Sequence, residues 1–207
     1  MKLTPIALLA GFLLLASCSI LPKPEPFDVY RLPVGQSASP AHGTPQQWSL
    51  RLTKLQTSDA LNSPNIAVIP QGDVISHYKG ARWSDPAPVL LRNRLLDGFQ
   101  RDGRVVLLST DDSLFHGDLE LGGNLREFQT EYQGTAAGVV VQLDALLVRG
   151  YDQRILASRR FEVHQPLNDV QVPAVVAGFG RANDQLTAQV VNWVVEQGQR
   201  FAPPPTP

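Results

Sequence analysis

Three long segments with the two-residue period of a β-strand lie close together in the second half of the chain. They are Gly117–Gln129, Gly138–Arg149 and Arg154–His164, and the links between them suit hairpins. In the middle segment every second residue from Val139 to Leu147 is apolar, which is typical of a strand with one buried face. The spacing predicts an antiparallel meander of three strands.

Two amphipathic helices are predicted beside this meander. The first covers 86–101, with Asp85 as its cap and Gly103 as its end. The second covers 172–197, where apolar residues return every three or four positions. Shorter strands are predicted at 27–32, 48–55, 66–69, 74–78 and 105–108. These elements predict an α+β domain, a mostly antiparallel sheet with both helices packed on one face.

The composition is that of a globular domain without signs of catalysis. Apolar residues make up 43% of the chain, and 18 basic residues stand against 19 acidic ones without a basic run, so nucleic acid is not an expected partner. No nucleophile elbow, phosphate loop, dinucleotide motif or zinc-helix motif occurs. The pair Asp111–Asp112 is predicted to be a solvated turn. We therefore expect no enzyme activity, no cofactor and no metal.

The N-terminus has the form of a bacterial lipoprotein signal. Lys2 supplies a positive start, and an apolar run over 6–15 follows that is too short for a membrane-spanning helix of about 20 residues. The run ends in Leu-Ala-Ser-Cys, a cleavage site that closes on cysteine. The pattern predicts a signal peptide over 1–17 and lipidation of Cys18 on its sulfur and its amine. An ordinary secretory signal that happens to contain a cysteine is the alternative.

Proline-rich segments flank the predicted domain. The lipidated cysteine and a proline-rich tether occupy 18–26, the folded domain 27–198, and a disordered proline-rich tail 199–207. Cys18 is the only cysteine in the chain, so the domain has no disulfide.

Two interpretations are open for Arg82 and Trp83, which directly precede the first predicted helix. Trp83 could cover the helix entry while Arg82 stays in water. The alternative is that both belong to a docking surface, because arginine and tryptophan are enriched among the residues that dominate binding energy at interfaces.

The chain resembles the ABC-type transport auxiliary lipoproteins, which include the paraquat-inducible lipoprotein group. The resemblance rests on the lipidated cysteine and proline tether, the aromatic-x-x-Tyr-x-Leu strand at 27–32, the Ser-Pro-Asn-Ile-Ala-Val segment at 63–68, and Arg-Trp-Ser-Asp-Pro at 82–86. The family usually has Trp-x-(Asp/Glu)-Pro or a close variant there. The resemblance covers nearly all of 18–197, whereas the proline tail after 201 is not a family feature.

The resemblance implies a non-catalytic, periplasm-facing outer-membrane lipoprotein. It would dock the MCE-domain protein of a lipid-transport system that also contains an ABC permease and an ATPase, and that moves phospholipid or other hydrophobic cargo between the membranes. Ser19, rather than aspartate, after the cysteine favours the outer membrane. Because MCE proteins form rings, a homo-oligomer is also expected. The alternatives are a lipoprotein that itself binds a lipid or other ligand between helices and sheet, and a structural outer-membrane lipoprotein without a transport role.

Overall fold

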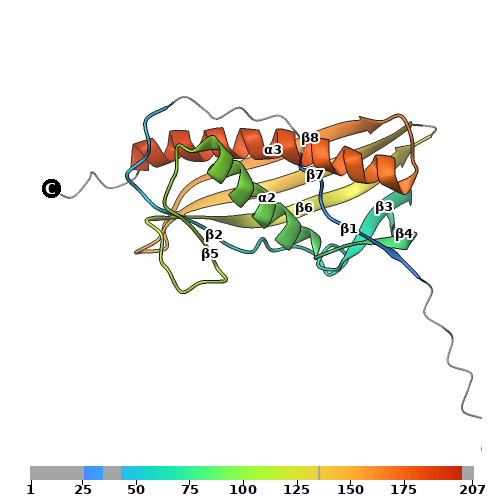
Figure 1. Ribbon diagram of the computed structural model, residues 1–207, viewed down its shortest axis with the longest axis horizontal. Coiled ribbons are helices and arrows are strands. Elements are labelled where there is room, and N and C mark those ends of the chain that lie inside the picture. The colour runs from blue at the N-terminus through green and yellow to red at the C-terminus, as the bar shows by residue number, and fades with distance from the viewer. Residues whose placement is uncertain (1–25, 35–42, 135, 202–207) are drawn as a thin grey trace, which may run out of the picture.

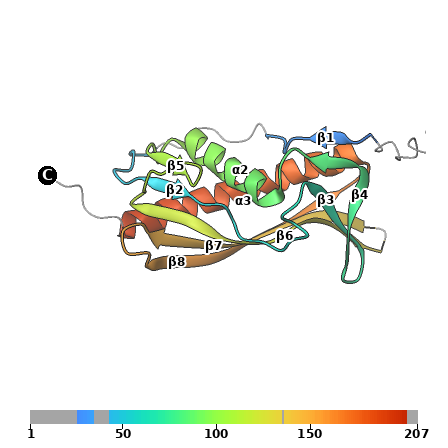
Figure 2. The same cartoon turned by 90° about the horizontal axis from the view of Figure 1, so that it is seen from below.

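The protein forms two layers, an eight-stranded curled sheet and a layer of two helices (Figure 1). The computed structural model describes residues 26–34, 43–134 and 136–201. The helices are α2 (Ala87–Asp102) and α3 (Val172–Phe201), and both lie on the same face of the sheet (Figure 2). The prediction of an α+β domain with two helices on one face is confirmed.

The sheet is built around the predicted meander. The strands are β1 (Asp28–Tyr30), β2 (Leu50–Leu52), β3 (Asn65–Gln71), β4 (Val74–Trp83), β5 (Leu108–Thr110), β6 (Leu119–Gln133), β7 (Ala136–Arg149) and β8 (Ile155–Leu167). β6 pairs antiparallel with β7, and β7 with β8. The other edge of β6 is shared: β3, followed by β4 and β1, pairs with its second half, and β2, followed by β5, pairs with its first half.

The sheet is mixed, so the prediction of a mostly antiparallel sheet is wrong in this respect. β1 with β4, β2 with β5, β2 with β6 and β3 with β6 are all parallel pairs. Alternation of apolar and polar residues has the same period in both kinds of pair, whereas a parallel pair also needs a long crossover connection. Long segments of chain separate the two strands of each parallel pair, and α2 lies in the connection from β4 to β5.

The core lies between the meander and α3. On β7 the predicted inward residues all have 0% exposure: Val139, Val141, Leu143, Ala145 and Leu147. α3 lies close against the sheet because Gly178 has no side chain, since a Cβ there would be 2.4 Å from Leu167 Cδ2. Trp193 is 6% exposed and its ring contacts that of Phe161, so its predicted core role is confirmed.

The two ends of α2 are formed in different ways. Gly103 ends the helix in the left-handed conformation, with φ 76°, and its N–H donates to Phe99 O at 3.1 Å, as predicted. The predicted cap is wrong: Pro86 is the N-cap residue and makes no side-chain bond, while Asp85 accepts a bond from Ser84 Oγ at 2.9 Å. Proline suits this position because the backbone N–H that it lacks would have no partner within the helix.

The two helices approach closely at Gly98, where a Cβ would lie 2.2 Å from Thr187 Cγ2. Gly98→Leu is therefore expected to lower the free energy of unfolding by about 2–3 kcal/mol, because the larger side chain would force α2 away from α3. Gln100→Leu, on the exposed face of the same helix, is the control and should change it by less than about 0.5 kcal/mol. Urea unfolding measures both variants, and equal losses would contradict the close approach.

Candidate functional site

The predicted lipid-attachment residue, Cys18, lies outside the described residues, as do the signal peptide 1–17 and most of the tether. The described chain begins at Pro26, just before β1, at the end of the molecule where the β3–β4 hairpin also lies (Figure 1). We call this the anchor end. Within the described part of the chain, neither helix combines the length and the apolar character needed to cross a bilayer.

Trp83 lies at the end of β4 with 0% exposure. Its ring meets the rings of Phe128 and Phe179 edge-on, with centroids 6.1 Å and 5.1 Å away. The three rings form an aromatic cluster between the sheet and α3. A side chain without exposed surface contacts no partner, so the docking interpretation does not hold for Trp83 in this structure.

Arg82 is half-buried and contacts the edge strand at the anchor end. Its guanidinium carbon lies 3.8 Å from the ring centroid of Phe27, which is a cation–π distance. Arg82 is also paired with Val29 in the β1–β4 ladder. The arginine therefore helps to hold β1 on the sheet, and its contribution to a docking surface stays a proposal.

Arg94 is a buried charge that the sequence analysis missed. Its side chain is 2% exposed, forms an ion pair with Asp184 of α3, and donates to Pro33 O at 2.7 Å. Burial lowers the pKa of Arg94, and the Asp184 carboxylate opposes this shift. The contacts join α2, α3 and the segment after β1. The available signal was an arginine directly before Leu95, within the apolar stripe of the helix.

The acidic pair at the end of β5 binds a second buried arginine. Arg92 Nη1 lies 2.5 Å from Asp111 Oδ1, and Arg92 Nη2 lies 2.7 Å from Asp112 Oδ2. Asp111 Oδ2 also accepts the Lys54 N–H at 2.8 Å. Asp112 is exposed, as expected for a solvated turn, but Asp111 is a structural partner of α2.

Stability should depend on the ionisation of Asp111. Burial by itself would raise the pKa of this carboxyl, but the Lys54 N–H and the Arg92 guanidinium hold it below the ordinary value of 3.8. A lowered folded-state pKa stabilises the fold above pH 3.8, and this contribution is lost as the pH falls through the folded-state pKa. Asp111→Asn should therefore cost about 1–3 kcal/mol at pH 7 and less at pH 3.

Urea unfolding of the wild type and of Asp111→Asn at both pH values tests this expectation. Asp73→Asn, in the exposed β3–β4 turn, is the control and should have little effect at either pH. An Asp111→Asn loss of equal size at pH 7 and pH 3 would show that the charge of Asp111 is not the cause.

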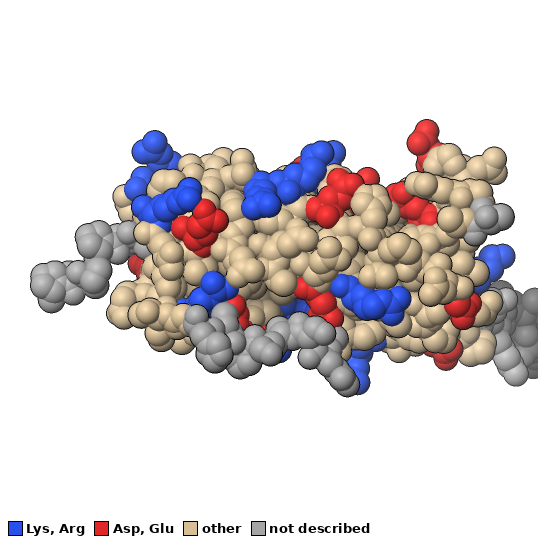
Figure 3. Space-filling model, turned by 90° about the horizontal axis from the view of Figure 1, so that it is seen from above, with Lys and Arg blue, Asp and Glu red and all other residues tan. Residues whose placement is uncertain are grey.

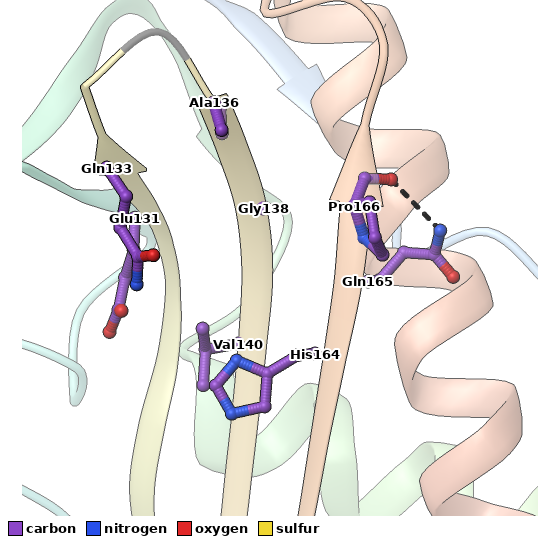
Figure 4. A pocket seen from close by; sticks show the side chains of 9 residues that line it. Glu131, Gln133, Ala136, Gly138, Val140, His164, Gln165 and Pro166 are labelled. Carbon is purple, nitrogen blue, oxygen red and sulfur yellow. Dashed lines mark hydrogen bonds between the residues drawn. The ribbon is translucent and has the colours of Figure 1, made fainter.

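A shallow groove of about 200 Å³ crosses β7 on the sheet face away from the helices (Figure 4). Ala136, Gly138 and Val140 line it from β7, Glu131 lies on β6, and His164 projects from β8 across β7. Sites for small molecules usually enclose about 300–1,000 Å³, so this groove is too small to hold a lipid. A larger hollow of about 360 Å³ has a mostly polar lining of Gln56, Thr57, Ser58, Asn124, Leu125 and Arg126.

The same face of the meander carries a set of carboxylates. Burial raises the pKa of Glu127, and the neighbouring Glu131 and Glu162 raise it further. The pKa of Glu162 is lowered by hydrogen bonds with His164, at 2.5 Å, and with Gln142. Nowhere in 26–34, 43–134 and 136–201 do three His, Cys, Asp or Glu side chains gather as a metal site would require. Figure 3 shows acidic and basic groups interspersed along one side of the molecule.

Exposed apolar side chains occur in the segments next to β5 and in the β7–β8 hairpin, which lie in the half of the molecule where α3 finishes (Figure 1). We call this group the distal tip: Leu107, Leu114, Phe115, Tyr151 and Ile155. Leu114 is 96% and Phe115 74% exposed, both in the loop between β5 and β6, and Tyr151 is 78% exposed in the β7–β8 hairpin. The Gly150 N–H donates to Asp118 O at 2.9 Å and thereby holds loop and hairpin side by side.

The distal tip corrects one prediction and reveals a missed feature. The predicted buried strand at 105–108 is wrong, because β5 begins only at Leu108 and both Val106 and Leu107 are exposed. The tip itself was not predicted. Its signal in the sequence was the apolar pair Leu114–Phe115 between polar residues typical of a turn.

Fold and surface together define a small α+β domain with a tightly packed interior and an exposed apolar tip. The family model of the ABC-type transport auxiliary lipoprotein component matches residues 30–191, and the chain belongs to this family. The family is described as the auxiliary lipoprotein component of ABC-type transport. The predicted family is confirmed.

Two solved structures share the fold. Protein XCC0632 from Xanthomonas campestris is 29% identical with a TM-score of 0.77, and the match covers 84% of this chain and 97% of that one. An uncharacterised protein is 15% identical with a TM-score of 0.60, over 82% and 99% of the two chains. Uncharacterised protein bll6063 of Bradyrhizobium diazoefficiens is 28% identical over 167 residues, which are 80% of this chain but only 44% of that relative.

Proposed function

We propose that this protein is a non-catalytic accessory lipoprotein of an MCE-type ABC system that transports phospholipid or other hydrophobic compounds between membranes. The observation that carries the proposal is membership, over 30–191, of a family of auxiliary transport lipoproteins. The proposed partners are an MCE-domain protein, an ABC permease and an ATPase. A homo-oligomer that matches an MCE ring is part of the proposal.

The proposed location is the periplasmic face of the outer membrane. Cys18 would carry the lipid anchor, and Ser19 in place of aspartate supports delivery to the outer membrane. Several acyl chains bind a bilayer far more firmly than one myristoyl chain, whose membrane binding is marginal. The domain would then stay within reach of the membrane while its remaining surface faces the periplasm.

The packed interior supports a docking function rather than a function as a lipid carrier. Between helices and sheet the space is occupied by fully buried large side chains: Trp83, Phe99, Phe128, Phe161 and Phe179. The close helix approaches at Gly98 and Gly178 leave no room there for an acyl chain without separating the layers. A ligand-binding lipoprotein is therefore the less favoured function, and no described feature favours a purely structural lipoprotein.

A deletion strain tests the proposal. Loss of the protein should disturb the lipid asymmetry of the outer membrane and the tolerance of cells to solvents. A detergent extract of membranes should also yield the MCE-domain protein together with this chain. Intact asymmetry and tolerance in the deletion strain, with no co-purified MCE-domain protein, would contradict the proposal. Native mass spectrometry of the purified protein with bound lipid would favour the ligand-binding alternative.

A further inference from the structure

The hairpin of β3 and β4 extends beyond the neighbouring strands as an arm (Figure 2). β6 pairs with β3 only as far as Ile69, and β1 pairs with β4 only from Ala81 onward. Among the described strands, the segment 70–76 therefore pairs only within the hairpin, and we call this segment the hairpin arm. Gly72, with φ 54°, lets the chain reverse within the two residues Gly72 and Asp73.

The arm carries exposed apolar side chains on both of its faces. Val74 and Ile75 are consecutive residues of β4, so their side chains point to opposite faces of the hairpin. They are 61% and 46% exposed, and no described element covers them. A protein partner on one face would leave the other face in water, whereas the headgroup region of a bilayer surrounds an inserted hairpin on all sides. The arrangement therefore favours a lipid surface as the occupant.

The predicted tether is long enough to bring this arm to the anchoring membrane. Ten residues separate Cys18 from Asp28 in β1, and they span at most about 36 Å. Asp28 pairs with Ala81, and the seven residues from Val74 to Ala81 span at most about 25 Å. Because the tether reaches further than this, the tip of the arm can enter the bilayer that holds the lipid of Cys18.

We infer that the hairpin arm inserts Val74 and Ile75 into the headgroup region of the bilayer that carries the lipid anchor. The inference rests on the proposed lipidation of Cys18 and is independent of the transport partner. Burial of apolar surface is the driving force, because Asp73 and Lys79, near the tip, are one charge of each sign. Lipid and arm together form two membrane contacts, which fix the orientation of the domain more firmly than a single tether does.

The first test measures contact with lipid in the full-length lipoprotein, reconstituted into vesicles of phosphatidylethanolamine with a minor share of phosphatidylglycerol. Cys18 is the only cysteine and its sulfur would be acylated, so a cysteine introduced elsewhere is the only free thiol. A nitrobenzoxadiazole label on Ile75→Cys should lose about half of its fluorescence or more when the vesicles contain doxyl-labelled lipid, because interfacial side chains lie about 5–10 Å deep. The same label on Leu114→Cys, a 96% exposed position of the distal tip, should lose little.

The second test asks whether the two apolar side chains cause the insertion. The label is placed on Gln71→Cys, beside the turn, and the chain is compared with and without Val74→Ser/Ile75→Ser. The double variant should lower the inserted fraction of the arm by about tenfold or more, since it removes the apolar surface that lipid covers. Leu114→Ser/Phe115→Ser is the matched control and should leave quenching at position 71 unchanged, as should vesicles without phosphatidylglycerol. Thermal melting verifies that each variant is folded.

Quenching at position 75 but not at 114, together with its loss at position 71 in the arm variant, supports the inference. Absent quenching at position 75, equal quenching at 75 and 114, or unchanged quenching in the arm variant overturns it. If the lipoprotein floats with the vesicles in these cases, the proposed anchor stands while the inference fails. If the protein neither floats with the vesicles nor incorporates labelled palmitate in cells, the anchor and the inference fail together.

Discussion

Replacing Trp83 by alanine is expected to lower the free energy of unfolding by about 3–5 kcal/mol, because it removes the central ring of a fully buried aromatic cluster. Phe128 and Phe179, stacked with centroids 4.9 Å apart, would lose the ring that packs edge-on against both. A loss of this size is a large part of the stability of an ordinary domain. Urea unfolding followed by tryptophan fluorescence and circular dichroism measures it.

Two control variants separate core packing from docking. Trp83→Phe keeps an apolar ring in place and removes the indole Nε1, which has no hydrogen-bond partner among the described residues. It should cost less than about 1.5 kcal/mol. Arg82→Ala loses only a partly exposed cation–π contact and should cost about 1 kcal/mol. Full stability of Trp83→Ala combined with lost partner binding would restore the docking interpretation.

Replacing Cys18 by alanine is expected to remove the lipid anchor altogether. Incorporation of radiolabelled palmitate should fall to background, and the protein should disappear from the outer-membrane fraction, because the acyl chains supply the membrane affinity. Lipid transport should fail as in the deletion strain. Metabolic labelling and membrane fractionation measure these outcomes.

Ser19→Asp is the matched control for the anchor. It leaves Cys18 in place, so labelling should persist, while the aspartate retention signal should keep the protein at the inner membrane. Undiminished palmitate labelling of Cys18→Ala would show that the cysteine is not the lipidation site. An outer-membrane position of Ser19→Asp would contradict only the proposed sorting.

Periodicity predicted the long elements well because their burial is regular. β7 was expected at 138–149 and is Ala136–Arg149, and α3 was expected over 172–197 and is Val172–Phe201. Each of these elements buries one stripe along its whole length, so the period of the apolar residues is visible without knowledge of the neighbours. The short strands were located less accurately, since a strand of three residues hardly defines a period.

The order and direction of the strands could not be predicted from the same patterns. β6 has two different sets of neighbours along one edge, β3 on one half and β2 on the other. Both contacts are parallel and join residues more than 60 positions apart in the chain. Such pairings depend on the path of the connections and on shape complementarity. The local alternation of apolar and polar residues contains no information about either.

The sequence by itself determined the lipid-anchor prediction at Cys18, the family and the two-helix α+β class, because these depend on motifs and on periods within single segments. Only the tertiary structure decided that Trp83 lies in the core and that Leu114 and Phe115 lie in water. Burial is a property of what packs around a residue. Trp83 is covered by Phe128 and Phe179, which are distant in the chain. Leu114 and Phe115 lie in the loop after β5, where no described element covers them.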